Sequence, residues 1–179
     1  MRKIQVTAMR KIKKAVPLIE NRLKVHFKFG RDQVVITGSE LNEFLCEEIV
    51  RAVDFGFRAD DALLLKDDNF VLEFIEVKEN THRKNLKDVR GRLIGTEGKA
   101  KKTIENLTDS VIVINGNRVG VIVDSNHLDA VVQAIESLIR GAKHGNVFSY
   151  LEKQGVAIRR KGEDDLGLKE DVEYLDEDE

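Results

Sequence analysis

The hydrophobic and polar residues of this chain form two kinds of periodic pattern, one typical of strands and one typical of helices. Short apolar or alternating segments predict strands at residues 3–8, 24–29, 33–37, 70–77, 111–114 and 119–123. Apolar residues that recur every three or four positions predict a helix ending near residue 21 and further helices at 40–56, 58–69, 84–94, 99–108, 125–140 and 147–153. The chain is therefore expected to fold as an α+β protein.

Turn and cap residues support this division. Asn115-Gly116-Asn117 separates the last two strands, and Asn-Gly is among the strongest signals for a hairpin turn. Ser39 is a suitable N-cap for the helix at 40–56, and Gly141 ends the helix at 125–140. We expect one apolar face of the helix at 40–56 to point inward, and this face comprises Leu41, Phe44, Leu45, Ile49, Ala52 and Val53.

The second half of the chain has the order strand, helix, turn, helix, strand, strand, helix. The turn between its first two helices is Gly95-Thr96-Glu97-Gly98. This order, with a Gly-x-x-Gly turn at this place, is the topology of a eukaryotic-type (type I) KH domain, a module whose glycine loop clamps about four nucleotides of single-stranded RNA. The sequence therefore predicts an intact KH domain over residues 67–155.

A weaker copy of the same pattern occupies the first third of the chain. The two copies share residue types at corresponding positions: Ile19-Glu20-Asn21 with Ile104-Glu105-Asn106, Gly30 with Gly116, Val35-Ile36 with Val121-Ile122, and Ser39 with Ser125. The same offset places Arg10-Lys11-Ile12-Lys13 where the second copy has its glycine turn, so the first copy lacks the loop, and too few residues precede it for a full strand and helix. The alternative is a chance similarity between two amphipathic segments.

These observations predict two tandem type I KH domains, each a three-stranded antiparallel sheet packed by helices on one face. Residues 1–66 form the shortened, degenerate domain, residues 67–155 form the intact one, and residues 156–179 form an acidic, disordered tail.

The net charge of −2 conceals an uneven distribution of charge. Residues 163–179 contain ten of the 32 acids and, of the 30 Lys and Arg, only Lys169. Residues 1–162 therefore carry 29 bases and 22 acids, a formal charge of +7. A basic body fits a polyanionic partner such as RNA. Disorder is expected for the acidic composition of the tail, which could alternatively bind a basic partner or shield the RNA groove.

The densest positive charge surrounds the glycine turn. Between His82 and Lys102 the chain carries eight Lys or Arg and only two acids. Glycines allow a phosphate backbone to approach closely, and the N–H groups that begin the following helix attract anions. We therefore expect RNA to contact residues in and around this turn: Arg90, Arg92, Ile94, Gly95, Thr96, Glu97, Gly98, Lys99, Lys101, Lys102 and Arg118.

Within this set, Arg92, Lys99 and Lys102 are expected to meet phosphates. Ile94 and the edge of the strand at 111–114 would form an apolar floor for the bases, and Arg118 would close the far side of the groove. Glu97 would repel phosphate, so we expect it to face the N-terminus of the following helix. The alternative is that this region is only a solvated basic helix face joined to a structural turn.

The residues that enzymes and metal sites require are scattered. His26, His82, His127 and His144 have no spacing typical of metal ligands. No cluster of acids at strand ends suggests a metal-dependent nuclease. The single cysteine, Cys46, lies in an apolar helical pattern and is expected to be a buried, unreactive thiol. The sequence thus predicts neither catalytic residues, nor a metal site, nor a cofactor. In the absence of a long apolar run or a signal-like segment, we expect a soluble, cytoplasmic protein.

From Gly56 to Lys153 the chain resembles the archaeal KH-domain proteins of small-subunit ribosome assembly. These are counterparts of the eukaryotic partner-of-Nob pre-rRNA processing factor and relatives of the Krr-type KH proteins. The motifs that carry the resemblance are Gly56-Phe57, Ala62-Leu63-Leu64-Leu65, Asp68, Phe70-Val71-Leu72-Glu73, Gly91-Arg92-Leu93-Ile94-Gly95, Gly98-Lys99-Ala100, Thr103-Ile104-Glu105-Asn106-Leu107-Thr108, Gly141-Ala142 and His144-Gly145-Asn146-Val147.

The resemblance implies binding to single-stranded RNA near the 3′ end of small-subunit (16S) rRNA, in ribosome biogenesis and rRNA processing. It also implies two partners, the endonuclease that trims this end and the alpha subunit of translation initiation factor two. Two alternatives stay open: a scaffold whose KH units bind proteins, and a KH RNA-binding regulator not tied to the ribosome.

Overall fold

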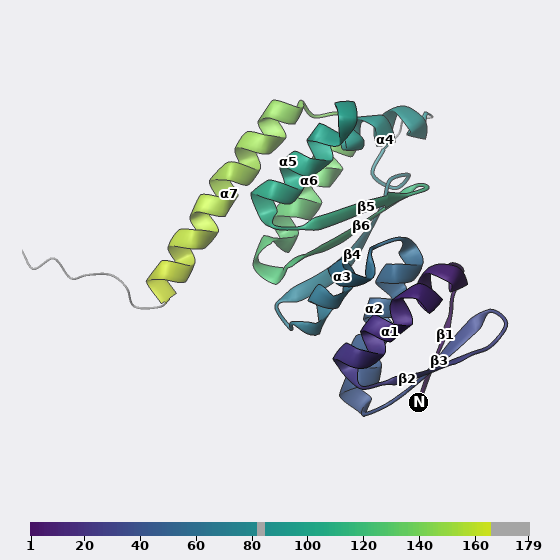
Figure 1. The fold of residues 1–179 in the computed structure, drawn as a ribbon. Coiled ribbons are helices and arrows are strands. Elements are labelled where there is room, and N and C mark those ends of the chain that lie inside the picture. Colours follow the sequence, from purple (N-terminus) through teal and green to yellow (C-terminus); the bar gives the residue numbers. More distant parts are fainter. Residues whose placement is uncertain (82–84, 166–179) are drawn as a thin grey trace, which may run out of the picture.

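The computed structural model describes residues 1–81 and 85–165, with side chains through residue 158. It contains two three-stranded antiparallel sheets (Figure 1). We call the segment from the first strand to Lys66 the first unit, and the segment from Phe70 to Asp165 the second unit. Within the described ranges, no helix is long and apolar enough to cross a membrane.

The first unit has one helix between its first two strands. Its elements are β1 (Arg2–Gln5), α1 (Met9–Leu23), β2 (His26–Phe29), β3 (Gln33–Thr37), α2 (Glu40–Phe55), α3 (Ala59–Ala62) and the 3-10 helix η1 (Leu63–Lys66). The sheet order is β1-β3-β2. Ile4, Val34 and Ile36 on one face of the sheet are buried against α1 and α2.

The second unit has a pair of helices at the corresponding place. Its elements are β4 (Phe70–Glu76), α4 (Leu86–Ile94), η2 (Thr96–Gly98), α5 (Lys99–Thr108), β5 (Val111–Asn115), β6 (Arg118–Asp124), η3 (Ser125–His127), α6 (Leu128–Arg140) and α7 (His144–Asp165). The sheet order, β4-β6-β5, matches that of the first unit. Ile75, Val121 and Val123 are buried on the face that packs against the helices of this unit.

The second sheet is covered on both faces, which differs from the prediction that helices pack each sheet on one face. Helices α4–α7 lie on one side of it, and α1, α2 and α3 lie between the two sheets (Figure 1). Ile122, with Phe70, Leu72, Val111 and Val113 around it, belongs to the core of the first unit. The first unit is therefore packed against the face that the second unit's own helices leave open.

Gly120 allows the two units to approach each other closely. A Cβ atom at this position of β6 would lie 2.7 Å from Phe55 Cε1 and 2.8 Å from Phe57 Cε2. The Phe55 ring also packs on Phe74 of β4, with ring centroids 4.8 Å apart. A glycine inside a strand often marks a close approach of this kind.

The two units share a hydrogen bond that supports the sequence repeat. In the first unit the Glu20 carboxylate accepts the backbone N–H of Phe27 at 3.0 Å, and in the second Glu105 accepts that of Ile112 at 2.8 Å. Both acceptors lie on the helix preceding an edge strand, and both helices end at a residue with positive φ, Lys24 (52°) and Asp109 (47°). Helix α1 therefore corresponds to α5, and the first unit has no counterpart of α4 or of the glycine turn.

Two features differ from the sequence-based predictions. The predicted inward face of α2 is wrong at Leu41 and Phe44, which are 66% and 50% exposed, because the buried face centres on Cys46, Ile49 and Val53. The predicted short helix at 147–153 is part of the longer α7, which continues to Asp165. The prediction of a disordered tail is therefore wrong for residues 156–165, and residues 166–179 lie outside the described residues.

Gly120→Ala is expected to reduce the free energy of unfolding by about 1–3 kcal/mol, because the new methyl group overlaps two packed aromatic rings. Denaturant unfolding measures this change. The matched control is Gly91→Ala in α4, where a Cβ meets nothing within 4 Å; this variant should gain about 0.5–1 kcal/mol, since alanine favours the helix. Equal stability of the two variants would contradict the close contact at Gly120.

Cys46 is fully buried, as predicted, and burial raises the pKa of its thiol to about 12 from the ordinary 9.0. Because the thiolate is the reactive form, we expect no reaction with a disulfide reagent at pH 8 until the chain unfolds.

Above pH 9 the unfolded thiol ionises while the native thiol stays protonated, so Cys46 should lower the free energy of unfolding as the pH rises from 9 towards 12. Rapid labelling of the folded protein would contradict both statements.

Candidate nucleic-acid interface

The glycine turn joins α4 to α5, and three of its four residues have unusual backbone conformations. Gly95 has φ 73° and ψ 175°, Glu97 has φ 54°, and Gly98 lies in the left-handed region with φ 75°. The Gly98 N–H donates to the Gly95 carbonyl at 3.2 Å, which closes the turn. The Gly95 conformation is open essentially to glycine alone, whereas the left-handed conformation of Gly98 favours glycine without requiring it.

The two glycines have different surroundings. A Cβ at Gly95 would lie 2.6 Å from Ala100 Cβ, so this glycine lets the turn fold against α5. A Cβ at Gly98 would meet nothing within 4 Å. Gly95 is thus needed by the fold itself, whereas Gly98 faces open space that a ligand could enter.

The N-terminus of α5 is available to an anion. Gly98 is its N-cap residue, and no side chain caps this end of the helix. The Glu97 carboxylate pairs with Lys99 Nζ at 3.4 Å, and both side chains are 76% exposed. Glu97 therefore lies beside the helix start, as predicted, but it neutralises a lysine rather than capping the helix.

Edge strand β5 runs beside α5. The Ile112 N–H points away from β6, because it donates to Glu105 of α5. Since N–H directions alternate along a strand, the N–H and C=O of Ile114 also point outward. The end of α4 contributes Ile94, 40% exposed. The turn, α5 and the β5 edge thus offer an anion site, an apolar side chain and outward-facing backbone groups in one region of the second unit.

Three of the four predicted cations described next, Lys101, Arg90 and Lys99, already contact other groups. Lys101 Nζ pairs with Glu105 at 2.9 Å. Arg90 donates to the Gly116 carbonyl at 3.0 Å and to Asn117 Oδ1 at 3.2 Å, which ties α4 to the tip of the β5–β6 hairpin. Lys99 pairs with Glu97. Lys102 is exposed on α5, and within the described part of the chain it has no ion-pair partner.

Arg92 is held inside the protein rather than facing the groove. Its Nη2 donates to the Ala142 carbonyl at 2.7 Å, and its Nε is buried without a hydrogen-bond partner among the described residues. The backbone carbonyl of Arg92 is 2.8 Å from His144 Nε2. This pair of contacts fixes the end of α4, next to the glycine turn, to the junction of α6 and α7.

Arg118 lies on the face of the second sheet that meets the first unit. Its Nε pairs with Glu76 at 2.5 Å, and its guanidinium is 4.8 Å from the centre of the Phe74 ring. The expectation that Arg118 closes the groove is therefore not supported by its position. The contacts of Arg92 and Arg118 involve residues distant in sequence, and the sequence contained no signal for either.

Among the residues that the structure describes, no three His, Cys, Asp or Glu side chains come together in a group that could hold a metal ion. The glycine turn, α5 and the β5 edge present backbone dipoles, cations and an apolar side chain, which suit the binding of a polyanion.

Residues 71–155 match a family model described as a eukaryotic-type KH domain (KH-domain type I). A KH domain-containing protein of Methanocaldococcus jannaschii is 32% identical over 164 residues, which cover 88% of this chain and 72% of that protein. The pre-rRNA-processing protein pno1 of Aspergillus fumigatus is 36% identical over 119 residues, but the match spans only 46% of its length.

Solved structures share the whole fold. A protein of unknown function from Aeropyrum pernix superposes with a TM-score of 0.83 at 26% identity, covering 94% of this chain and 97% of that one. In a complex of a/eIF2alpha, aDim2p and rRNA from Pyrococcus horikoshii, the matching chain has a TM-score of 0.76 at 27% identity, with 87% of this chain and 94% of that chain covered. The resemblance predicted from the sequence is confirmed: this chain belongs to the family of archaeal KH-domain proteins whose KH domain is of the PNO1 type.

Proposed function

We propose that the second unit binds single-stranded RNA in ribosome biogenesis, at the 3′ end of small-subunit rRNA, through the groove between the glycine turn and β5. The observation that carries this proposal is the uncapped N-terminus of α5 behind the open Gly98. The names of the relatives support the cellular process, since they include a pre-rRNA-processing protein and a chain solved with rRNA.

Each part of the groove has a role in this proposal. A phosphate lies at Gly98, where the N–H groups of α5 attract it. Lys102 and Lys99 add positive charge along the same helix. The bases lie towards Ile94 and β5, where the outward N–H and C=O of Ile114 hydrogen-bond to base edges.

Arg92 and His144 act as positioning residues in this proposal, because they contact α6, α7 and the end of α4 rather than the groove. They hold the turn at a fixed place relative to the rest of the second unit. Arg118 is not included among the proposed RNA-binding residues, because it lies on the face of the second sheet that meets the first unit.

The partners follow from the same relatives. The complex from Pyrococcus horikoshii combines a/eIF2alpha with aDim2p and rRNA, which supports association of this chain with an initiation factor two alpha subunit. Partnership with the endonuclease that trims the rRNA 3′ end rests on the family resemblance alone. The alternative function is a scaffold that binds proteins and not RNA. The Gly98→Asp test below distinguishes it from RNA binding.

Gly98→Asp is expected to weaken binding of an oligonucleotide from the rRNA 3′ end by at least about tenfold, since it places a carboxylate where the phosphate lies (tenfold corresponds to 1.4 kcal/mol). Fluorescence anisotropy measures the affinity, and a thermal melt verifies the fold. The matched control is Gly145→Asp, because Gly145 is equally open; it should bind like the unchanged protein.

If neither glycine variant loses RNA affinity, the clamp is rejected and the scaffold function is left. If both lose affinity equally, the effect is one of net charge. An oligonucleotide of scrambled sequence that binds as tightly as the rRNA 3′ end would reject that target while keeping the clamp.

The salt dependence of RNA binding separates a phosphate contact from a positioning contact. Lys102→Ala should reduce the slope of log affinity against log salt by about 0.7, the value for one phosphate contact on a single strand. Arg92→Ala should weaken binding and lower the free energy of unfolding by about 1–3 kcal/mol, because the Ala142 carbonyl loses its donor. Its slope should stay unchanged; a slope reduced as in Lys102→Ala would place Arg92 on a phosphate instead.

A further inference from the structure

The outer edge of β4 presents unpaired backbone groups. Ser125 N–H donates to the Asn69 carbonyl and Val77 N–H to the Asn117 carbonyl, each at 2.8 Å, so the odd-numbered residues of β4 bond to β6. The N–H and C=O groups of Leu72 and Phe74 therefore point away from the sheet. No hydrogen bond joins them to any described residue. An edge of this kind is a template for an added strand.

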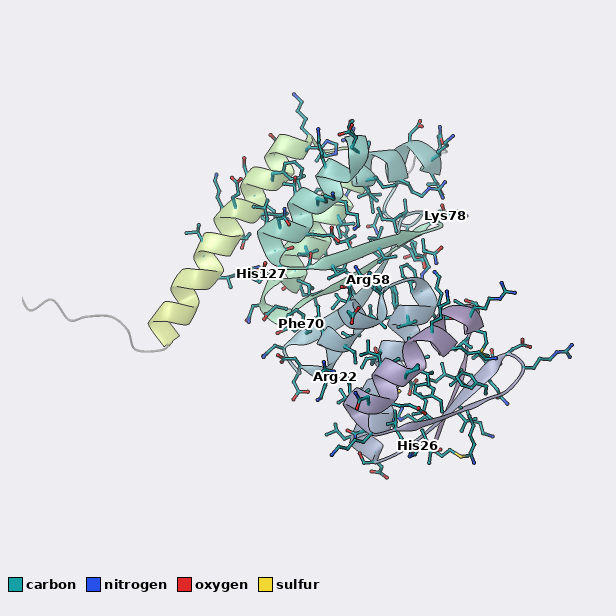
Figure 2. The ribbon with its side chains drawn as sticks, in the orientation of Figure 1. Arg22, His26, Arg58, Phe70, Lys78 and His127 are labelled. Carbon is teal, nitrogen blue, oxygen red and sulfur yellow. The ribbon has the colours of Figure 1, made fainter. Side chains whose placement is uncertain are left out.

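An apolar groove lies beside this edge. A cavity of about 300 Å³ separates it from α2, and its apolar lining consists of Phe44, Leu45, Leu65, Phe70, Val71 and Leu72. Phe44 is half exposed, and Leu41, one turn earlier on α2, is more exposed still. Figure 2 shows Phe70 at the start of the strand, near the border between the two units, and Lys78 beyond the other end of the strand. Apolar side chains on one face of an added strand would pack against the apolar lining of this groove.

The charge around this groove is opposite to that of the rest of the body. From Asp67 to Glu76 the chain carries four acids and no Lys or Arg, whereas residues 1–31 carry ten bases and one acid. Glu48 and Asp68 line the groove, where Glu48 pairs with Arg51 at 3.1 Å and Arg2 lies over the Phe44 ring. Glu73 is exposed at the same edge of β4, on the face opposite to Leu72. Asp68 and Glu73 have no ion-pair partner within the described ranges. Such a rim repels RNA and the acidic C-terminal residues, and it attracts a cationic chain.

We propose that the β4 edge and the groove beside α2 bind an extended, cationic segment of a partner protein as an added strand. Main-chain hydrogen bonds to Leu72 and Phe74 would supply affinity, alternate apolar side chains would enter the groove, and Lys or Arg side chains would pair with Asp68 and Glu73. The RNA groove lies at β5, the opposite edge of the same sheet. The two ligands therefore bind at the same time without competing.

The probe is an eight-residue peptide of alternating lysine and valine, and its comparison has glutamate in place of lysine. Fluorescence anisotropy with the full chain should show at least tenfold tighter binding of the lysine peptide. The double variant Asp68→Lys with Glu73→Lys should reverse this preference, and the control Glu152→Lys, at an exposed site on α7, should leave it unchanged. A preference that the control also reverses, or that the double variant keeps, would overturn the proposal.

Two further variants test the strand pairing itself. Leu72→Pro removes an N–H that points outward, so it spares the ladder to β6 and should abolish binding of the lysine peptide. A lysine peptide with N-methylated valines lacks backbone donors and should likewise lose at least tenfold in affinity against the unchanged protein. Full binding of the N-methylated peptide would overturn the proposal even if Leu72→Pro does not fold.

Two other possible occupants of the β4 edge are RNA and a second copy of this chain, and each would give a different result. Displacement of the peptide by the RNA oligonucleotide would place this edge on the RNA path and overturn the proposal. Sedimentation velocity tests for the second copy. A dimer of the unchanged chain that dissociates in the Asp68→Lys, Glu73→Lys variant would show that the occupant is a second copy, and it would also overturn the proposal.

Discussion

The contact of Phe55 and Phe57 with Gly120 determines which surfaces of the second unit remain available. The first unit covers much of one face of the second sheet, and helices α4–α7 cover the other. The two edges of the sheet remain, β5 beside the glycine turn and β4 beside α2. Both proposed binding sites therefore lie at strand edges. At each edge the backbone is the constant element, while neighbouring side chains set the charge: cationic around β5, acidic around β4.

The repeated glutamate explains how both units keep their edge strands in place. Glu20 and Glu105 each accept the N–H of an edge residue seven positions later, and each is followed by a helix end with positive φ. One carboxylate thus fixes the distance between a helix and the strand that follows it. In the second unit this distance separates α5 from β5, the two elements that flank the proposed RNA site. In the first unit the same contact persists without a glycine turn before it, so the contact belongs to the fold of the unit and not to RNA binding alone.

Periodicity and turn residues located most of the elements, because local sequence determines them. The helix predicted at 84–94 is α4 from Leu86 to Ile94, and the hairpin at Asn115-Gly116-Asn117 joins β5 to β6 as predicted. The predicted burial of Leu41 and Phe44 was wrong. A helical period identifies an apolar stripe, but it does not show how much of that stripe a neighbouring sheet covers. Arg92 was assigned to the RNA site by its nearness in sequence to the glycine turn, and Arg118 by its place directly after the hairpin turn at Asn115-Gly116-Asn117. Their side chains instead follow long-range partners, a carbonyl 50 residues away and the acid Glu76 across the ladder.

Glu97 affects both the backbone conformation of the glycine turn and its charge. A side chain with φ 54° is strained by comparison with glycine or asparagine, and its carboxylate stands where RNA phosphates are expected. Its pairing with Lys99 removes one positive charge from the turn in the free protein. Because both side chains are largely exposed, the ion pair itself contributes little to folding. An approaching phosphate must therefore compete with Glu97 for Lys99. In the proposed complex the turn would therefore bind a single strand less tightly than its count of cations suggests, and base contacts at Ile114 and Ile94 would carry a larger share of the discrimination between sequences.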